Sequence, residues 1–106
     1  MSGINRGVNP RDVLYPETNW RLMDILYEGR WWSLALGRWK QDGEWRPVLA
    51  QRWNGDKGEL GNPISIGFPT WFIVPDSTYK LFVDSEFVPA EKRQFLVNVL
   101  GLDIDP

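Results

Sequence analysis

The side chains available for chemistry in this chain are few, because its 106 residues include no histidine and no cysteine. Without those residues the chain cannot form a serine–histidine triad, a cysteine nucleophile or a cysteine/histidine zinc site. The remaining acids match no recognised catalytic or metal-binding pattern. We therefore expect a protein without catalytic residues, cofactor or metal, and a carboxylate-based hydrolase is kept as an alternative. The acids considered are Asp24, Glu44, Asp56, Glu59, Asp76, Asp84 and Glu86.

Tryptophan and arginine are the other candidates for chemistry, since several of the seven tryptophans stand next to an arginine in the sequence. Sequence neighbours on a strand point to opposite faces, so we do not expect these adjacent residues to touch. Cross-strand pairs are the relevant ones, and they fix a hairpin tip or offer a stacking platform. The expected pairs are Trp39 with Arg46 and Lys40 with Trp45.

Asp42-Gly43 predicts a two-residue type I′ turn, because aromatic and aliphatic runs flank it on both sides. Placing Gln41 opposite Glu44 sets the register of the hairpin. The missing N–H of Pro47 then points away from the partner strand, which suits a strand with an open edge. The other predicted pairs are Trp39 with Arg46, Leu36 with Leu49, Ala35 with Ala50, and Trp32 with Trp53.

Residues 20–27 form either a third strand or a short helix capped by Thr18 or Asn19. We favour the strand, with a turn at Glu28-Gly29 that sets Trp20 opposite Gly37. The result is an antiparallel meander over about 20–53.

The whole chain, 1–106, is predicted to be a single domain of the α+β class. It has an irregular arm at 1–19 and a Gly/Pro-rich loop at 54–70, which ends before a buried strand at 71–74. Residues 79–83 are either a short strand or a single turn. Pro89 and Gly101 bracket a C-terminal helix at about 89–100, which we expect on one face of a four- or five-stranded antiparallel sheet.

One helix cannot cover both faces of this sheet, so the second face is the candidate binding surface. We expect Asp24, Ser33 and Arg52 side by side there, next to a low floor of small residues. The face is covered by 1–19 or 54–70, by the second subunit of a homodimer, or by a ligand. Trp32, Trp53 and Trp71 are assigned to the core. The candidate binding residues are Trp20, Asp24, Trp31, Trp39, Arg46 and Arg52.

The leading hypothesis is a non-enzymatic binding module that takes a small ligand or a protein partner, with self-association as one form. The alternative partner is single-stranded nucleic acid, stacked on tryptophan and arginine. A net charge of −2 makes duplex nucleic acid an unfavourable partner. The longest apolar stretch, 71–75, is far shorter than the roughly 20 residues of a membrane helix. With no apolar secretory segment at its start, the chain is expected to be a soluble, cytoplasmic protein of bacterial type.

Overall fold

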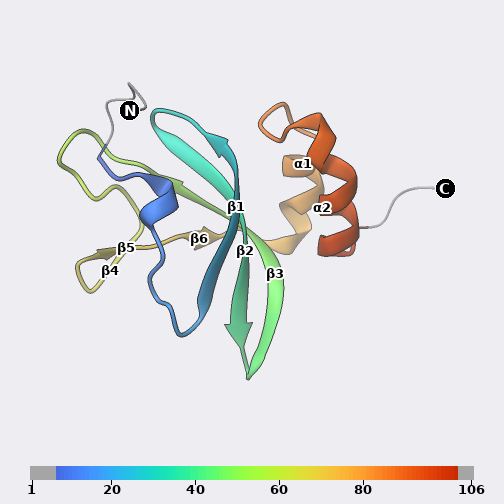
Figure 1. Cartoon of the computed structure of the whole chain (residues 1–106), viewed down its shortest axis with the longest axis horizontal. Coiled ribbons are helices and arrows are strands. Elements are labelled where there is room, and N and C mark those ends of the chain that lie inside the picture. Colours follow the sequence, from blue (N-terminus) through green and yellow to red (C-terminus); the bar gives the residue numbers. More distant parts are fainter. Residues whose placement is uncertain (1–6, 103–106) are drawn as a thin grey trace.

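A computed structural model describes residues 7–102, so the first part of the predicted arm, 1–6, lies outside the described residues, as do 103–106. The α+β class is confirmed (Figure 1). The larger sheet is antiparallel, in the order β1-β2-β3-β6, and a separate pair of short strands is formed by β4 and β5. The strands are β1 (Trp20–Glu28), β2 (Trp32–Gln41), β3 (Glu44–Trp53), β4 (Ile64–Ser65), β5 (Phe68–Pro69) and β6 (Phe72–Ile73).

The β2–β3 hairpin has the register that its turn predicts, from Gln41 opposite Glu44 to Trp32 opposite Trp53. Asp42 and Gly43 both have positive φ, 54° and 81°, which the type I′ turn requires. Strand β6 pairs with β3 only at Ala50 and Gln51. Pro47 therefore lies on a part of β3 whose outer edge makes no strand pairing.

Residues 20–27 belong to strand β1, so the predicted strand is confirmed and the alternative helix is not. The register predicted for this strand is wrong. Trp20 lies opposite Trp39 instead of Gly37. The pairing shifts twice, between Leu22 and Asp24 and again between Ile25 and Tyr27. Such a β-bulge inserts an extra residue and breaks the alternation of faces. Asp24 is thereby turned to the helical side of the sheet.

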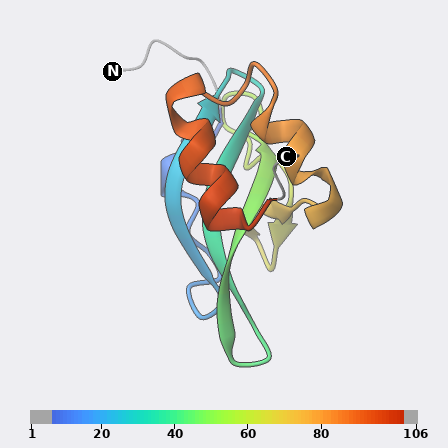
Figure 2. The same cartoon turned by 90° about the vertical axis from the view of Figure 1, so that its right-hand side faces the viewer.

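The helices lie across one face of the sheet (Figure 2). Residues 76–83 form a 3-10 turn, Asp76–Thr78, followed by α1 (Tyr79–Val83). The predicted C-terminal helix begins with a 3-10 turn, Ala90–Lys92, and continues as α2 (Arg93–Leu100), ending at Gly101 with φ 67°. Leu36, Leu49 and Leu96 are fully buried members of the core between the layers. This burial of apolar side chains holds α2 on the sheet.

The chain's own arm and loop cover the second face of the sheet. The arm carries a 3-10 turn, Pro10–Asp12, and Figure 1 shows it with β4 and β5 on the side away from the helices. The indole Nε1 of Trp71 donates to the carbonyl oxygen of Val13 at 2.8 Å. The Trp20 ring lies directly over Gly37, where a Cβ atom would collide with it. The groove expected on this face is therefore filled by the protein itself.

Residues 64–69 depart from the predicted loop, because they form the β4–β5 hairpin. Its turn is Ile66-Gly67, with φ values of 49° and 81°. A β-branched residue in the left-handed region is rare, so no turn rule pointed to this hairpin.

Candidate functional site

The residues proposed from the sequence as one binding surface are not brought together. Trp20 and Arg52 are buried, at 3% and 2% exposure. Trp39 and Arg46 do lie opposite each other near the tip of the β2–β3 hairpin. Of the predicted row of Asp24, Ser33 and Arg52, the last two lie opposite each other, but the place of Asp24 is wrong, because the bulge sets it opposite Leu36. The Asp24 carboxylate instead pairs with the Lys92 ammonium at 2.8 Å.

The Arg52 side chain binds backbone carbonyl groups of the 54–70 segment instead of a carboxylate. Its guanidinium donates to the carbonyl oxygen of Thr70 at 2.5 Å and to that of Leu60. No ion pair to a carboxylate is found for it within residues 7–102. Burial lowers the pKa of Arg52 to about 10, because an apolar surrounding disfavours the charged form. The arginine thus ties the middle and the end of the 54–70 segment to the sheet.

Cation–π contacts confirm one predicted pair and reveal two more. The Lys40 ammonium lies 6.0 Å from the Trp45 ring centroid, as expected, and the Arg21 guanidinium lies closer, at 4.9 Å. The Arg30 guanidinium stands 4.5 Å from the ring of its sequence neighbour Trp31. The rule against such neighbour contacts fails here because residues 29–31 form the loop between β1 and β2, not a strand.

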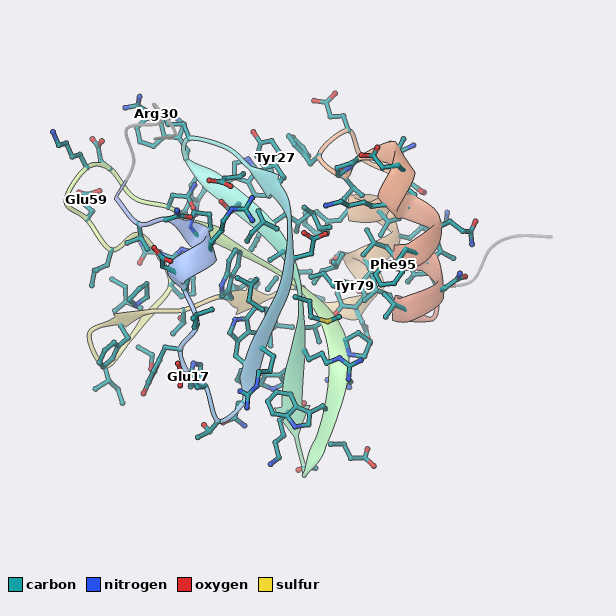
Figure 3. The ribbon with its side chains drawn as sticks, viewed as in Figure 1. Glu17, Tyr27, Arg30, Glu59, Tyr79 and Phe95 are labelled. Carbon is teal, nitrogen blue, oxygen red and sulfur yellow. The ribbon has the colours of Figure 1, made fainter. Side chains whose placement is uncertain are left out.

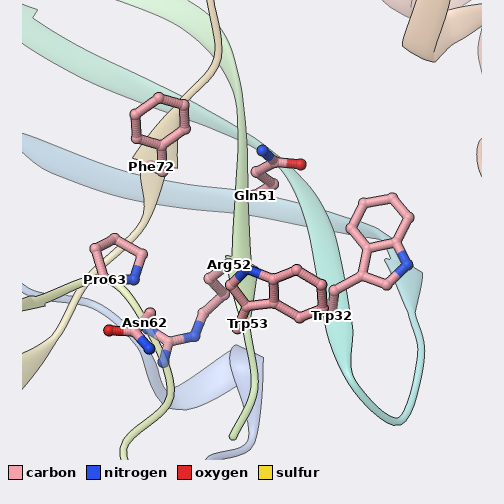
Figure 4. Close-up of a pocket in the computed structure, with 7 residues that line it drawn as sticks. All are labelled: Trp32, Gln51, Arg52, Trp53, Asn62, Pro63 and Phe72. Carbon is pink, nitrogen blue, oxygen red and sulfur yellow. The ribbon is translucent and has the colours of Figure 1, made fainter.

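A pocket of about 490 Å³ opens where β3 reaches the 54–70 segment. Figure 4 shows its side chains arriving from β2, β3, β6 and the stretch just before β4. Arg52, whose guanidinium is engaged by the carbonyl oxygens described above, also borders it. We call the other lining residues the Trp53 surface: Trp32, Gln51, Trp53, Asn62, Pro63 and Phe72.

Exposed aromatic rings dominate the Trp53 surface. Trp53 is 60% exposed and Phe72 is 52% exposed. The prediction of Trp53 as a core residue is therefore wrong, since it stands at the last residue of β3. Trp32 is half-buried and is fixed by ring contacts with Tyr27 at 4.9 Å and Phe87 at 5.0 Å. The pocket is thus an apolar recess. Trp32 on one side of it is packed against other rings, whereas Trp53 and Phe72 are largely exposed.

A second cavity, of about 440 Å³, lies beside Trp53 and shares Trp53 and Asn62 with the first pocket. We call it the acidic cavity, because it is lined by the carboxylates Asp56 and Glu59 together with Trp31 and Ile64. Figure 3 shows Glu59 and Arg30 at the end of the molecule away from Phe95 on α2. The two recesses therefore adjoin at Trp53 and Asn62.

A third cavity, of about 800 Å³, lies between β3, β6 and the end of α2. Arg46, Asp76 and Tyr79 line it, so its charged side chains have opposite signs. Burial, with the Asp76 carboxylate adding to it, raises the pKa of Tyr79, against the lowering effects of the Leu49 amide and Arg46. None of the strongly exposed apolar side chains lines this cavity, which makes it the weaker candidate.

Most of the strongly exposed apolar side chains gather at the end of the molecule that carries the Trp53 surface. They line the two recesses, form the β4–β5 hairpin, or lie in the arm beside Phe68. Met23, Leu81 and Phe95 lie elsewhere. Surface apolar residues collected in this way are typical of interaction sites. The gathered residues are Leu14, Trp31, Trp53, Leu60, Ile64, Ile66, Phe68 and Phe72.

Phe72 and Pro63 are site residues that the sequence did not predict. The sequence predicts a wholly buried strand at 71–74, whereas Trp71 is buried and Phe72 is exposed. The alternation of faces along a strand was the available signal, because it places Trp71 and Phe72 on opposite sides. For Pro63 the sequence held no comparable signal.

Comparisons with family models, with curated proteins and with solved structures find no match to this chain. Within residues 7–102, no helix is long and apolar enough to cross a membrane. The same residues contain no group of three or more acids placed to hold a metal ion. Function must therefore be argued from the geometry of the site.

Proposed function

We propose that this chain is a binding module that docks a polypeptide partner on the Trp53 surface, with an apolar side chain of the partner seated in the pocket. The carrying observation is the apolar recess between Trp53 and Phe72, both more than half exposed. Exposed tryptophan around a pocket is the usual composition of an interface anchor. Gln51 and Asn62 supply amide groups for hydrogen bonds to the partner's backbone.

The two other hypotheses receive less support. Stacking of single-stranded nucleic acid uses aromatic rings beside basic side chains, whereas the cavity next to Trp53 is lined by Asp56 and Glu59. A hydrolase needs two carboxylates directed at one substrate bond. Asp24 and Asp84 are instead paired with Lys92 and Lys80, in separate parts of the fold. Asp56 and Glu59 do line one cavity, but one oxygen of each accepts a backbone N–H of their own loop.

Selection from a random peptide library tests the proposal. We expect the selected peptides to share an apolar residue and to bind Trp53→Ala and Phe72→Ala at least about ten-fold more weakly, as interface anchors do. Leu81→Ala is the matched control, because Leu81 is 73% exposed on α1, outside the surface. If no peptide is selected, or the selected peptides bind Trp53→Ala and wild type equally, the proposed function is wrong.

A further inference from the structure

We infer that the partner segment carries a lysine or arginine close to its apolar anchor, and that this basic group enters the acidic cavity. The inference rests on the proposed function, because it describes the same partner. The apolar pocket and the acidic cavity share Trp53 and Asn62. A segment whose apolar side chain fills the first recess therefore has its neighbouring residues beside the second.

The chemistry of the acidic cavity suits a cation. Among residues 7–102, two carboxylates, Asp56 and Glu59, line it, and no lysine or arginine does. Trp31 and Trp53 add indole rings that are 49% and 60% exposed. A cation placed against such rings gains a cation–π attraction in addition to the ion pair.

The chain's own Arg30 provides an internal example of this recognition. Its guanidinium stands over the Trp31 ring and lies 4.0 Å from Oδ1 of Asp56. A planar cation thus already stands against a tryptophan face, at the outer limit of ion-pair distance from a carboxylate that lines the cavity. Glu59 lies on the same loop, and no ion pair to a basic side chain is found for it within residues 7–102.

The loop holds both carboxylates in place before any partner arrives. Oε1 of Glu59 accepts from the backbone N–H of Asp56 at 2.8 Å, and Oδ1 of Asp56 accepts from that of Lys57 at 2.8 Å. The backbone N–H of Glu59 closes the turn on the carbonyl oxygen of Asp56 at 2.9 Å. Within residues 7–102, these bonds use only one oxygen of each carboxylate. Pre-ordered groups of this kind lower the entropy cost of binding.

Three capped tetrapeptides separate the two parts of the hypothesis: Gly-Phe-Lys-Gly, Gly-Phe-norleucine-Gly and Gly-Phe-Glu-Gly. Affinity is measured by tryptophan fluorescence and by amide chemical-shift perturbation. We expect the lysine peptide to bind about five-fold more tightly than the norleucine peptide, and the glutamate peptide to bind most weakly. The preference should shrink in about 1 M salt, which screens exposed charges.

The double variant Asp56→Asn/Glu59→Gln locates the effect. It should lose the preference for lysine and still bind the norleucine peptide as wild type does, which also shows that the fold is intact. The matched control is Asp42→Asn/Glu44→Gln, which removes the same charge at the exposed β2–β3 turn. This control should keep the preference.

The outcomes distinguish the inference from the proposed function. Equal binding of the lysine and norleucine peptides overturns the inference and leaves the apolar anchor in place. A preference that survives in Asp56→Asn/Glu59→Gln, or that disappears equally in the control, also overturns it. If none of the phenylalanine peptides binds, the proposed function itself fails.

Discussion

The buried side chain of Arg52 attaches the 54–70 segment to the sheet. Burying a guanidinium without a carboxylate is costly, because the ion loses its hydration. The planar group offsets part of that cost by donating to two carbonyl oxygens, those of Leu60 and Thr70, which a lysine could not reach in the same geometry. An apolar residue at this position would leave both acceptors without their donor. Its role is therefore structural, although the sequence predicted it beside Asp24 on the candidate binding surface.

Tyr79 gives a prediction at the same scale. Burial raises the pKa of Tyr79 above its ordinary value of 10.0, so the folded protein keeps this proton where the unfolded chain loses it. The stabilising contribution of Tyr79 is present below about pH 10 and is lost as the pH rises further. We expect the absorbance of phenolate near 295 nm to show one of the three tyrosines ionising later than the others.

Tyr79→Phe is the variant that isolates this effect. It should abolish the late step and weaken the loss of stability above pH 10, measured by urea unfolding at several pH values. The lowered pKa of Arg52 acts with the opposite sign, since the unfolded chain then binds more protons and stability rises with pH. The difference between wild type and variant cancels that contribution. A titration curve unchanged by the substitution would contradict the assignment.

At the level of elements, the strong turn signal at Asp42-Gly43 was a dependable guide, whereas the weaker one at Glu28-Gly29 set the wrong register. Asp42-Gly43 defines the β2–β3 register without error, because few residue pairs favour two positive φ values. The bulges of β1 escaped prediction because the residues around them, such as Met23 and Leu26, are apolar and read equally well on either face. The extra residue between Leu22 and Asp24 then moved Asp24 to the other side of the sheet.

The β4–β5 hairpin carries a prediction of its own. Ile66 has φ 49° and is 84% exposed, so its side chain gains little burial while its backbone is strained. Asparagine tolerates the left-handed region far better than a β-branched residue. We expect Ile66→Asn to raise the free energy of unfolding by about 1 kcal/mol, measured by urea denaturation.

Asp42→Asn is the matched control for this turn. Asp42 has φ 54° at the equivalent position of the β2–β3 hairpin, and asparagine suits that position as well as aspartate does. The control should change stability by less than about 0.5 kcal/mol, as surface substitutions usually do. A loss of stability in Ile66→Asn would mean that the isoleucine side chain makes a contact worth more than the strain.

For the whole molecule, the sequence predicted a helical layer packed on a sheet, but not how far the helices extend along the strands. A helical layer on one face of an antiparallel sheet follows from the apolar patterns, and the structure has it. The reach of that layer depends on how α1 and α2 lie across the strands, which no local pattern encodes. Trp53 was assigned to the core for this reason, although it stands in the open at the end of β3. The candidate site is formed at just this boundary.

The cover on the second face gives a prediction at the scale of the whole chain. Val13 is fully buried and its carbonyl oxygen accepts from Trp71, while the N–H groups of Gly7 and Val8 donate to the carbonyl oxygens of Gly55 and Asn54. Deleting residues 1–13 removes all of these contacts and exposes the apolar face under them. We expect the free energy of unfolding to fall by about 3–5 kcal/mol, from lost burial and an unpaired indole N–H.

The same deletion tests whether the arm stands where a second subunit would otherwise dock. A sheet face stripped of its cover presents an apolar patch, and such patches associate. The truncated chain should therefore sediment as a concentration-dependent oligomer, whereas the full chain should not. Deleting only residues 1–6 is the control, because the contacts named above are made by residues 7–13 and remain. A truncated chain that stays monomeric with unchanged stability would show that the arm is no part of the core.

Oligomers of the full chain would instead point to the Trp53 surface, since the second face is already covered. In that case the variant Trp53→Ala is expected to dissociate them.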